Sequence, residues 1–201
     1  MNIYKIIKNY LNLIKIKFYS RKFKTFEKLE KFCANKSNYD KDTNSLFRFN
    51  KFNLNKNDIP TLYNQQYNIL LTAVDKFISK YKYFPKIIDF GGGFGEGYFF
   101  LKNFYVNQYI EYNVVEIPKI VELSKEITQK ILNDNLSFHT SLKDTLKGNN
   151  PDLIFSSSTL QYLKEPYKIL DELNSSRSKI ICLTRNSFSD KTMFYSQVSR
   201  L

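Results

Sequence analysis

A glycine-rich segment carries the residues best suited to binding a ligand. The stretch "DFGGGFGEG", residues 89–97, holds five of the six glycines in the chain. Glycine adopts turns with positive φ and places no Cβ between the backbone and a bound molecule. A helix that begins directly after such a segment would direct free N–H groups and its dipole at an anionic or carboxylate-bearing group. The segment therefore predicts a ligand-binding loop.

The register of the glycines separates two classes of cofactor. Counted from Gly91, the dinucleotide pattern G-x-G-x-x-G fails because Glu96 takes the third glycine position, where its charge would repel a pyrophosphate. The pattern acid-x-G-x-G-x-G fits at every position, with Asp89, Gly91, Gly93 and Gly95. A nucleoside methyl donor carries an ammonium and a carboxylate in place of phosphates, and Asp89 suits the ammonium. The loop therefore favours a methyl donor over a nicotinamide cofactor.

The elements that position this loop alternate along the chain. A helical stripe of apolar residues runs from Pro60 to about Lys80. Strands are then predicted at 86–90, 109–117, 135–139, 151–158 and 179–184, and helices at 96–104, 118–132, 141–147 and 165–176. The strands are apolar runs without alternation, as expected when helices cover both faces of a parallel sheet. We expect a doubly wound, Rossmann-like α/β domain of five strands, with the loop at the carboxyl end of the first.

The N-terminal region differs in charge. The chain has 201 residues and a net charge of +12, and residues 1–36 hold ten Lys and Arg against two Glu. This concentration argues against a uniform nucleic-acid-binding surface. An apolar stripe over residues 3–18 predicts an amphipathic helix, which either contacts an anionic membrane through residues 1–25 or packs on protein. We assign residues 1–60 to this helix and a polar connector, and residues 61–201 to the α/β domain.

The composition of the chain indicates the cellular compartment that we expect. The two cysteines, Cys33 and Cys182, lie far apart and show no metal-ligand spacing, which favours a reducing cytoplasm and no metal site. No window of 18 apolar residues predicts a transmembrane helix. The lysines near the N-terminus interrupt any signal-peptide core. We expect a cytoplasmic protein, with peripheral membrane contact as the alternative.

A second acid completes a recognisable pattern. Glu116 ends the second predicted strand, 21 residues after Gly95. With this arrangement the chain resembles the class I S-adenosylmethionine-dependent methyltransferases. More narrowly, "IIDFGGGFGEGYF", "NVVEIPKIV", "LSFHTSL" and "DLIFSSSTLQYLKEPYKIL" resemble a bacterial methyltransferase family associated with surface-polysaccharide gene clusters. The likeness covers about residues 25–190, and Asn38 replaces the glycine of that family's Gly-Tyr-Asp.

The resemblance implies a cofactor, a reaction and a set of site residues. The cofactor is S-adenosylmethionine, and the expected reaction is O-methylation of a sugar or glycan intermediate. The Glu116 carboxylate would accept hydrogen bonds from the ribose hydroxyls. Residues expected to line the donor pocket are Asp89, Gly91, Gly93, Gly95, Glu116, Ile117, Thr140, Ser141, Ser156 and Ser157. Gln161 and Tyr162 are expected on the acceptor side, with Tyr39 as a lid residue.

The catalytic residue stays unassigned. Methyl transfer displaces a neutral leaving group, so positioning can supply much of the catalysis. A hydroxyl acceptor would also need a base. His139 is either that base or a residue beside the adenine. Arg185 either binds an anionic or sugar acceptor or is a surface charge.

The chain also departs from the family. The usual sheet has seven strands and ends in an antiparallel hairpin, whereas 16 residues follow Arg185. We expect the C-terminal hairpin to be missing, with two readings: the chain is a truncated gene product, or a partner covers the edge of its sheet. The fifth strand would then be an uncovered edge through which a homo-oligomer could form. The alternative function is an inactive or accessory protein that keeps the cofactor fold and acts through its basic helix.

Overall fold

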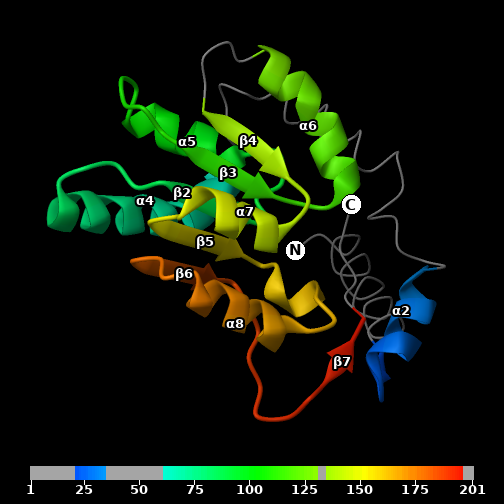
Figure 1. The fold of residues 1–201 in the computed structure, drawn as a ribbon. Helices are drawn as coiled ribbons and strands as arrows, with labels where there is room; N and C mark the ends of the chain where they lie inside the picture. Colours follow the sequence, from blue (N-terminus) through cyan, green and yellow to red (C-terminus); the bar gives the residue numbers. More distant parts are fainter. Residues whose placement is uncertain (1–20, 35–60, 131–134, 197–201) are drawn as a thin grey trace, which may run out of the picture. The chain divides into compact units, whose positions relative to one another are not determined.

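The computed structural model describes residues 21–34, 61–130 and 135–196 (Figure 1). The chain divides into two compact units, one of Met1–Asn38 with Phe188–Leu201 and one of Tyr39–Ser187. Each unit is described by itself below. The sequence had not indicated that residues from Phe188 onward group with the N-terminal segment. The expected boundary at residue 60 lies outside the described residues, as does the whole N-terminal helix predicted over residues 3–18.

The larger unit is built on five parallel strands. These are β2 (Ile87–Phe90), β3 (Tyr112–Val115), β4 (Leu136–His139), β5 (Leu153–Ser157) and β6 (Ile180–Thr184), in the order β4-β3-β2-β5-β6. The chain builds outward from β2 on one side through β3 and β4, and then on the other through β5 and β6 (Figure 1). The order reverses between β2 and β5, which is where open α/β sheets bind ligands. The predicted five-stranded Rossmann-like sheet is confirmed.

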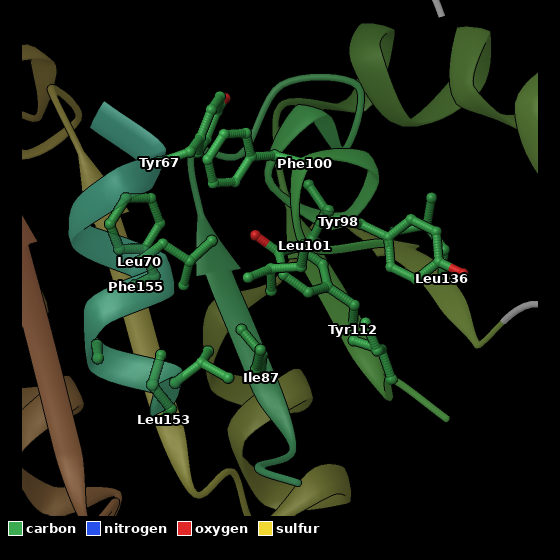
Figure 2. Close-up of a cluster of buried hydrophobic side chains, with 14 residues drawn as sticks. Tyr67, Leu70, Ile87, Tyr98, Phe100, Leu101, Tyr112, Leu136, Leu153 and Phe155 are labelled. Atoms are coloured by element: carbon green, nitrogen blue, oxygen red, sulfur yellow. The ribbon is translucent and has the colours of Figure 1, made fainter. Parts of the chain in front are cut away.

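Helices cover both faces of this sheet. They are α4 (Thr61–Tyr81), α5 (Glu96–Phe104), α6 (Pro118–Lys130), α7 (Leu142–Asn149), η1 (Leu160–Tyr162) and α8 (Pro166–Ser175). On one face, residues of α4 and α5 such as Leu70 and Leu101 pack against Tyr112 and Phe155 (Figure 2). On the other face, side chains of α7, η1 and α8 pack against residues of β2, β3 and β5. Because all four residues of β2 are buried, the strand shows no polar alternation.

A single carboxylate connects the amino ends of three strands. Asp152 accepts hydrogen bonds from the Tyr83 hydroxyl at 2.8 Å, the Lys86 backbone N–H at 3.1 Å and the Lys179 ammonium at 2.6 Å. Burial alone would raise the pKa of Asp152, but these hydrogen bonds lower it below its usual value. Lys86, Asp152 and Lys179 come just before β2, β5 and β6, so the contact fixes where these strands begin.

The smaller unit contains a short antiparallel pair that the sequence did not predict. Strand β1 (Lys22–Phe23) pairs with β7 (Phe194–Tyr195), and helix α2 (Phe26–Ala34) follows β1. The Arg21 N–H donates to the Ser196 hydroxyl at 2.9 Å, which extends the pairing. Among the described residues, no antiparallel strand joins the five-stranded sheet. The described part of the chain also contains no helix long and apolar enough to cross a membrane.

Candidate functional site

The glycine loop joins the carboxyl end of β2 to the first turn of α5. Gly91, Gly93 and Gly95 have φ values of 76°, 60° and 83°, a backbone conformation that residues with a Cβ rarely adopt. The Gly91 N–H donates to the Val115 carbonyl of the neighbouring strand β3 at 2.9 Å. The loop therefore starts as an extension of the sheet and then turns at the carboxyl end of β2. This places its backbone at the end of the sheet expected to bind a ligand.

Two glycines of the segment 89–97, Gly91 and Gly97, are also required by the protein's own packing. A Cβ on Gly91 would overlap the side chain of Thr159, whose hydroxyl donates to the Phe90 carbonyl at 3.2 Å. A Cβ on Gly97 would overlap the hydroxyl of Tyr112. The sequence explains the concentration of glycine by turns with positive φ and by close approach of a ligand. The structure adds a further cause, because polar side chains from β3 and from the segment after β5 pack directly against the loop and the start of α5.

Asp89, the leading acid of the motif, is buried beneath the loop. Its side chain is on the face covered by α4 and α5, it is 2% exposed, and Oδ2 accepts a hydrogen bond from the Tyr112 hydroxyl at 2.7 Å. Burial raises the pKa of Asp89 to about 7; the Tyr112 hydrogen bond lowers it in part, and the charges of Glu96 and Glu116 raise it further. Its expected contact with a donor ammonium stays a prediction.

This buried acid makes folding stability depend on pH. The pKa of Asp89 rises from about 3.9 in an unfolded chain to about 7 in the fold. The folded state therefore holds more protons between these values, and stability falls as pH rises through this window, by up to about 1.4 kcal/mol per pH unit. Asp89→Asn should remove this slope in urea unfolding between pH 4.5 and 8. The exposed control Asp171→Asn should keep it; an unchanged slope in Asp89→Asn would contradict the assignment.

Two further carboxylates bind backbone N–H groups of the loop. Glu116, directly after β3, accepts from the Gly93 N–H at 3.1 Å through Oε1 and from the Ile117 N–H at 2.9 Å through Oε2. Glu96, the first residue of α5, accepts from the Phe94 N–H at 2.9 Å. The N–H groups of Gly93 and Phe94 thus already face carboxylates. This arrangement disfavours a pyrophosphate and suits a cationic ligand.

The carboxyl end of β4 holds the residues expected near an adenine. The His139 Nε2–H donates to the Asn113 side-chain oxygen at 2.9 Å. Burial lowers the pKa of His139, so its imidazole is neutral at neutral pH. Thr140 is exposed. The Ser141 hydroxyl caps α7 by accepting from the Asp144 N–H at 3.2 Å.

At the end of β5, consecutive serines differ in their contacts. Ser156 is fully buried, and its hydroxyl donates to the Phe90 carbonyl at 2.9 Å, which ties β5 to β2. Ser157 Oγ is also buried but has no hydrogen-bond partner among the described residues. Gln161 and Tyr162 are exposed on η1, and Arg185 is exposed after β6. Tyr39 lies outside the described residues.

The structure brings together some of the expected residues and separates others. One carboxylate, that of Glu116, contacts both Gly93 and Ile117. The two catalytic candidates lie at opposite edges, His139 on β4 and Arg185 after β6. Four strand spacings separate them, roughly 19 Å, so both cannot contact one reacting methyl group. No group of metal-ligating side chains occurs in the described ranges.

Comparisons with known proteins give structural likeness without a sequence family. No protein-family model matches the chain, and no curated protein matches it. Among solved structures it is similar to the plantazolicin methyltransferase BamL, crystallised with a triazolic desmethylPZN analog and SAH, at 19% identity over 72% of this chain and 51% of that chain, with a TM-score of 0.49. The bifunctional kinase-methyltransferase WbdD matches at 11% identity over 59% of this chain and 27% of that chain, with a TM-score of 0.46.

Human N-acetylserotonin methyltransferase, crystallised with SAM, is a further similar structure. It matches at 17% identity over 57% of this chain and 31% of that chain, with a TM-score of 0.42. The chain thus spans about half the length of BamL and less of the other two proteins. At these identities and scores, function has to be inferred from the residues of the site itself.

Proposed function

We propose that this protein is an S-adenosylmethionine-dependent methyltransferase that O-methylates a sugar or glycan intermediate. One observation carries the proposal. The left-handed glycine loop after β2 and the Glu116 carboxylate after β3 are joined by the hydrogen bond from Gly93 to Glu116. This places an acid at the end of the neighbouring strand, beside a loop whose backbone a nucleoside can approach closely.

The residues of the site fit such a cofactor. A carboxylate can accept about four hydrogen bonds, so Glu116 can serve a ribose diol in addition to backbone N–H groups. His139, Thr140 and Ser141 would lie on the adenine side. Glu96 and Glu116 place negative charge around the loop, which suits a sulfonium and an ammonium. The cofactor, when bound, supplies an electrophilic methyl group on sulfur.

The chain's own residues would then act mainly by positioning. Loss of a neutral thioether needs little charge stabilisation, so holding the acceptor oxygen in line with the methyl group supplies much of the effect. His139 is neutral and could accept a proton, but it lies two strand spacings from β2, roughly 10 Å. This position supports a role for His139 beside the adenine rather than at the acceptor.

Calorimetry with S-adenosylhomocysteine tests the proposal. We expect binding to the full chain with an affinity between roughly micromolar and submillimolar, because the carboxylates favour this ligand over a pyrophosphate. NADH is the matched control and should not bind. If S-adenosylhomocysteine fails to bind at millimolar concentration, or if NADH binds more tightly, the proposed function is wrong.

The basic N-terminal segment supports a second candidate function. Its ten Lys and Arg against two Glu within residues 1–36 suit an accessory protein that acts at an anionic membrane or on a partner. This candidate would be cytoplasmic and membrane-peripheral. Binding to vesicles of anionic lipid, lost on deletion of residues 1–25 and without transfer of methyl groups to any glycan extract, would favour it over the enzyme.

A further inference from the structure

Two buried hydroxyl groups at the carboxyl end of the sheet have no hydrogen-bond partner in the part of the chain that the structure describes. They are Ser157 Oγ on β5 and Thr184 Oγ1 on β6, and among the described residues neither is paired. Ser157 and Thr184 are neighbours in the β5–β6 register, and Thr184 is 8% exposed. Folded proteins rarely leave buried polar atoms unpaired, because each costs free energy. A polar ligand would explain this pair.

The two hydroxyl groups lie on the face of the sheet that α4 covers. Side chains alternate along a strand, so Ser157 shares the face of Phe155, and Thr184 shares that of Cys182. Phe155 packs beside Tyr67 of α4, with ring centroids 6.4 Å apart (Figure 2). One residue earlier in α4, Gln66 contacts the Arg185 guanidinium. The hydroxyl pair, which we call the polar floor, therefore faces α4 near Gln66 and Tyr67.

The backbone around this floor is strained at two neighbouring points. Ser158 and Arg185, directly after β5 and β6, have φ values of 61° and 55°, although neither is glycine. The Ser158 N–H donates to the Thr184 carbonyl at 2.9 Å, so the two turns are joined. Left-handed non-glycine residues persist where the surrounding structure enforces them, and they cluster at ligand sites. Here the second turn holds the cationic Arg185 directly after Thr184, with its guanidinium in contact with Gln66 of α4.

The floor is close to the glycine loop. Asp89 pairs in register with Phe155, so Ser157, two residues on, is level with Gly91. Strands β5 and β6 lie one and two spacings from β2, roughly 5 and 10 Å. If the proposed function holds, a molecule on this floor would lie within reach of a methyl group bound at the loop.

We propose that Ser157, Thr184, Arg185 and Gln66 form the acceptor subsite, and that the acceptor is a sugar carrying a carboxylate or a phosphate. Each hydroxyl group both donates and accepts, which matches the hydroxyl groups of a sugar. The guanidinium pairs with planar or tetrahedral anions. This inference rests on the proposed function and specifies its substrate class.

Ligand-observed NMR of the full chain tests the subsite with three sugars, with and without S-adenosylhomocysteine. D-glucuronate and D-glucose 6-phosphate should each bind about fivefold to tenfold more tightly than D-glucose, and the tighter of the two identifies the anion. Arg185→Gln should remove this preference. Arg177→Gln is the matched control, because the backbone of Arg177 also has a positive φ but this residue follows α8 at the opposite end of the sheet. Equal binding of all three sugars would overturn the proposal.

The hydroxyl variants separate a binding role from a structural one. Thr184→Val and Ser157→Ala should each weaken glucuronate or glucose 6-phosphate binding about fivefold to tenfold, while the unfolding temperature stays level or rises, because an unpaired polar atom is removed. Thr184→Ser should bind as the native protein does. A fall in unfolding temperature with unchanged sugar binding would assign the hydroxyl groups to the fold and overturn the proposal.

Donor binding is measured separately on the same variants. If S-adenosylhomocysteine binds the native protein but no anionic sugar does, the acceptor subsite is wrong and the proposed function stands. If S-adenosylhomocysteine does not bind at all, the proposed function is wrong. If Arg185→Gln weakens the binding of S-adenosylhomocysteine, the subsite binds the carboxylate of the donor. This outcome also overturns the acceptor assignment.

Discussion

Replacing Glu116 with alanine should weaken S-adenosylhomocysteine binding by roughly 1–3 kcal/mol, a factor of about 5 to 150. The carboxylate has two contributions to lose. It would accept hydrogen bonds from the ribose, and it holds the loop through the Gly93 N–H at 3.1 Å. Titration calorimetry on the native and variant proteins measures the change directly.

Two companion variants identify the origin of the loss. Glu122→Ala removes an exposed carboxylate of α6 that pairs with Lys119, and donor affinity should not change. Glu116→Gln keeps the shape of the side chain and one accepting oxygen, so its loss should be smaller than that of Glu116→Ala. If Glu116→Ala binds S-adenosylhomocysteine as tightly as the native protein does, Glu116 is not part of the donor site.

Gly97→Ala should lower the free energy of unfolding by about 1–3 kcal/mol, the usual cost of overpacking a core. In an open helix the same change is stabilising by up to about 1 kcal/mol. The sign reverses here because the added Cβ would overlap the buried Tyr112 hydroxyl, which donates to Asp89. Urea unfolding of both proteins at one pH gives the difference.

A second glycine in the chain provides the control. Gly148 lies in α7, and a Cβ there would meet no atom within 4 Å, so Gly148→Ala should be neutral or stabilising. In a Tyr112→Phe background, which lacks the hydroxyl, the cost of Gly97→Ala should shrink. Equal costs in the two backgrounds would show that the overlap with Tyr112 is not the cause.

Local sequence patterns predicted most of the larger unit. Helix α5 begins and ends at the expected residues 96 and 104, because Gly95 precedes it and apolar spacing defines its length. Strand β3 was expected over 109–117 but spans Tyr112–Val115, since Tyr109 is 66% exposed and leaves the sheet. The β1–β7 pair joins residues more than 170 positions apart, and no local pattern indicates such a contact.

The residues of the candidate site also fall into those that a local pattern predicts and those that depend on long-range contacts. The loop and Glu116 could be found from the sequence, because each is defined by its position relative to one strand. Tyr112 and Thr159 could not be found in this way, because their contacts with Asp89 and Gly91 depend on strand register and on packing between distant segments. The proposed role of Thr184 depends on strand register too. Asp89 shows the difference. Its place at a strand end predicts contact with a ligand, and this stays a prediction. The β2–β3 pairing also places Asp89 beside Tyr112 in the core, which no local pattern indicates.

The Asp152 contact has a mechanical consequence. It anchors β2, β5 and β6 at the end of the sheet opposite the glycine loop. With their starting points fixed, these strands cannot slide past one another when a ligand enters. Any movement that accompanies ligand capture must then be taken up by rotation of backbone beyond the strand ends, at the glycine loop and at the turns after β5 and β6. Ligand affinity can therefore change through these turns while the sheet keeps its register.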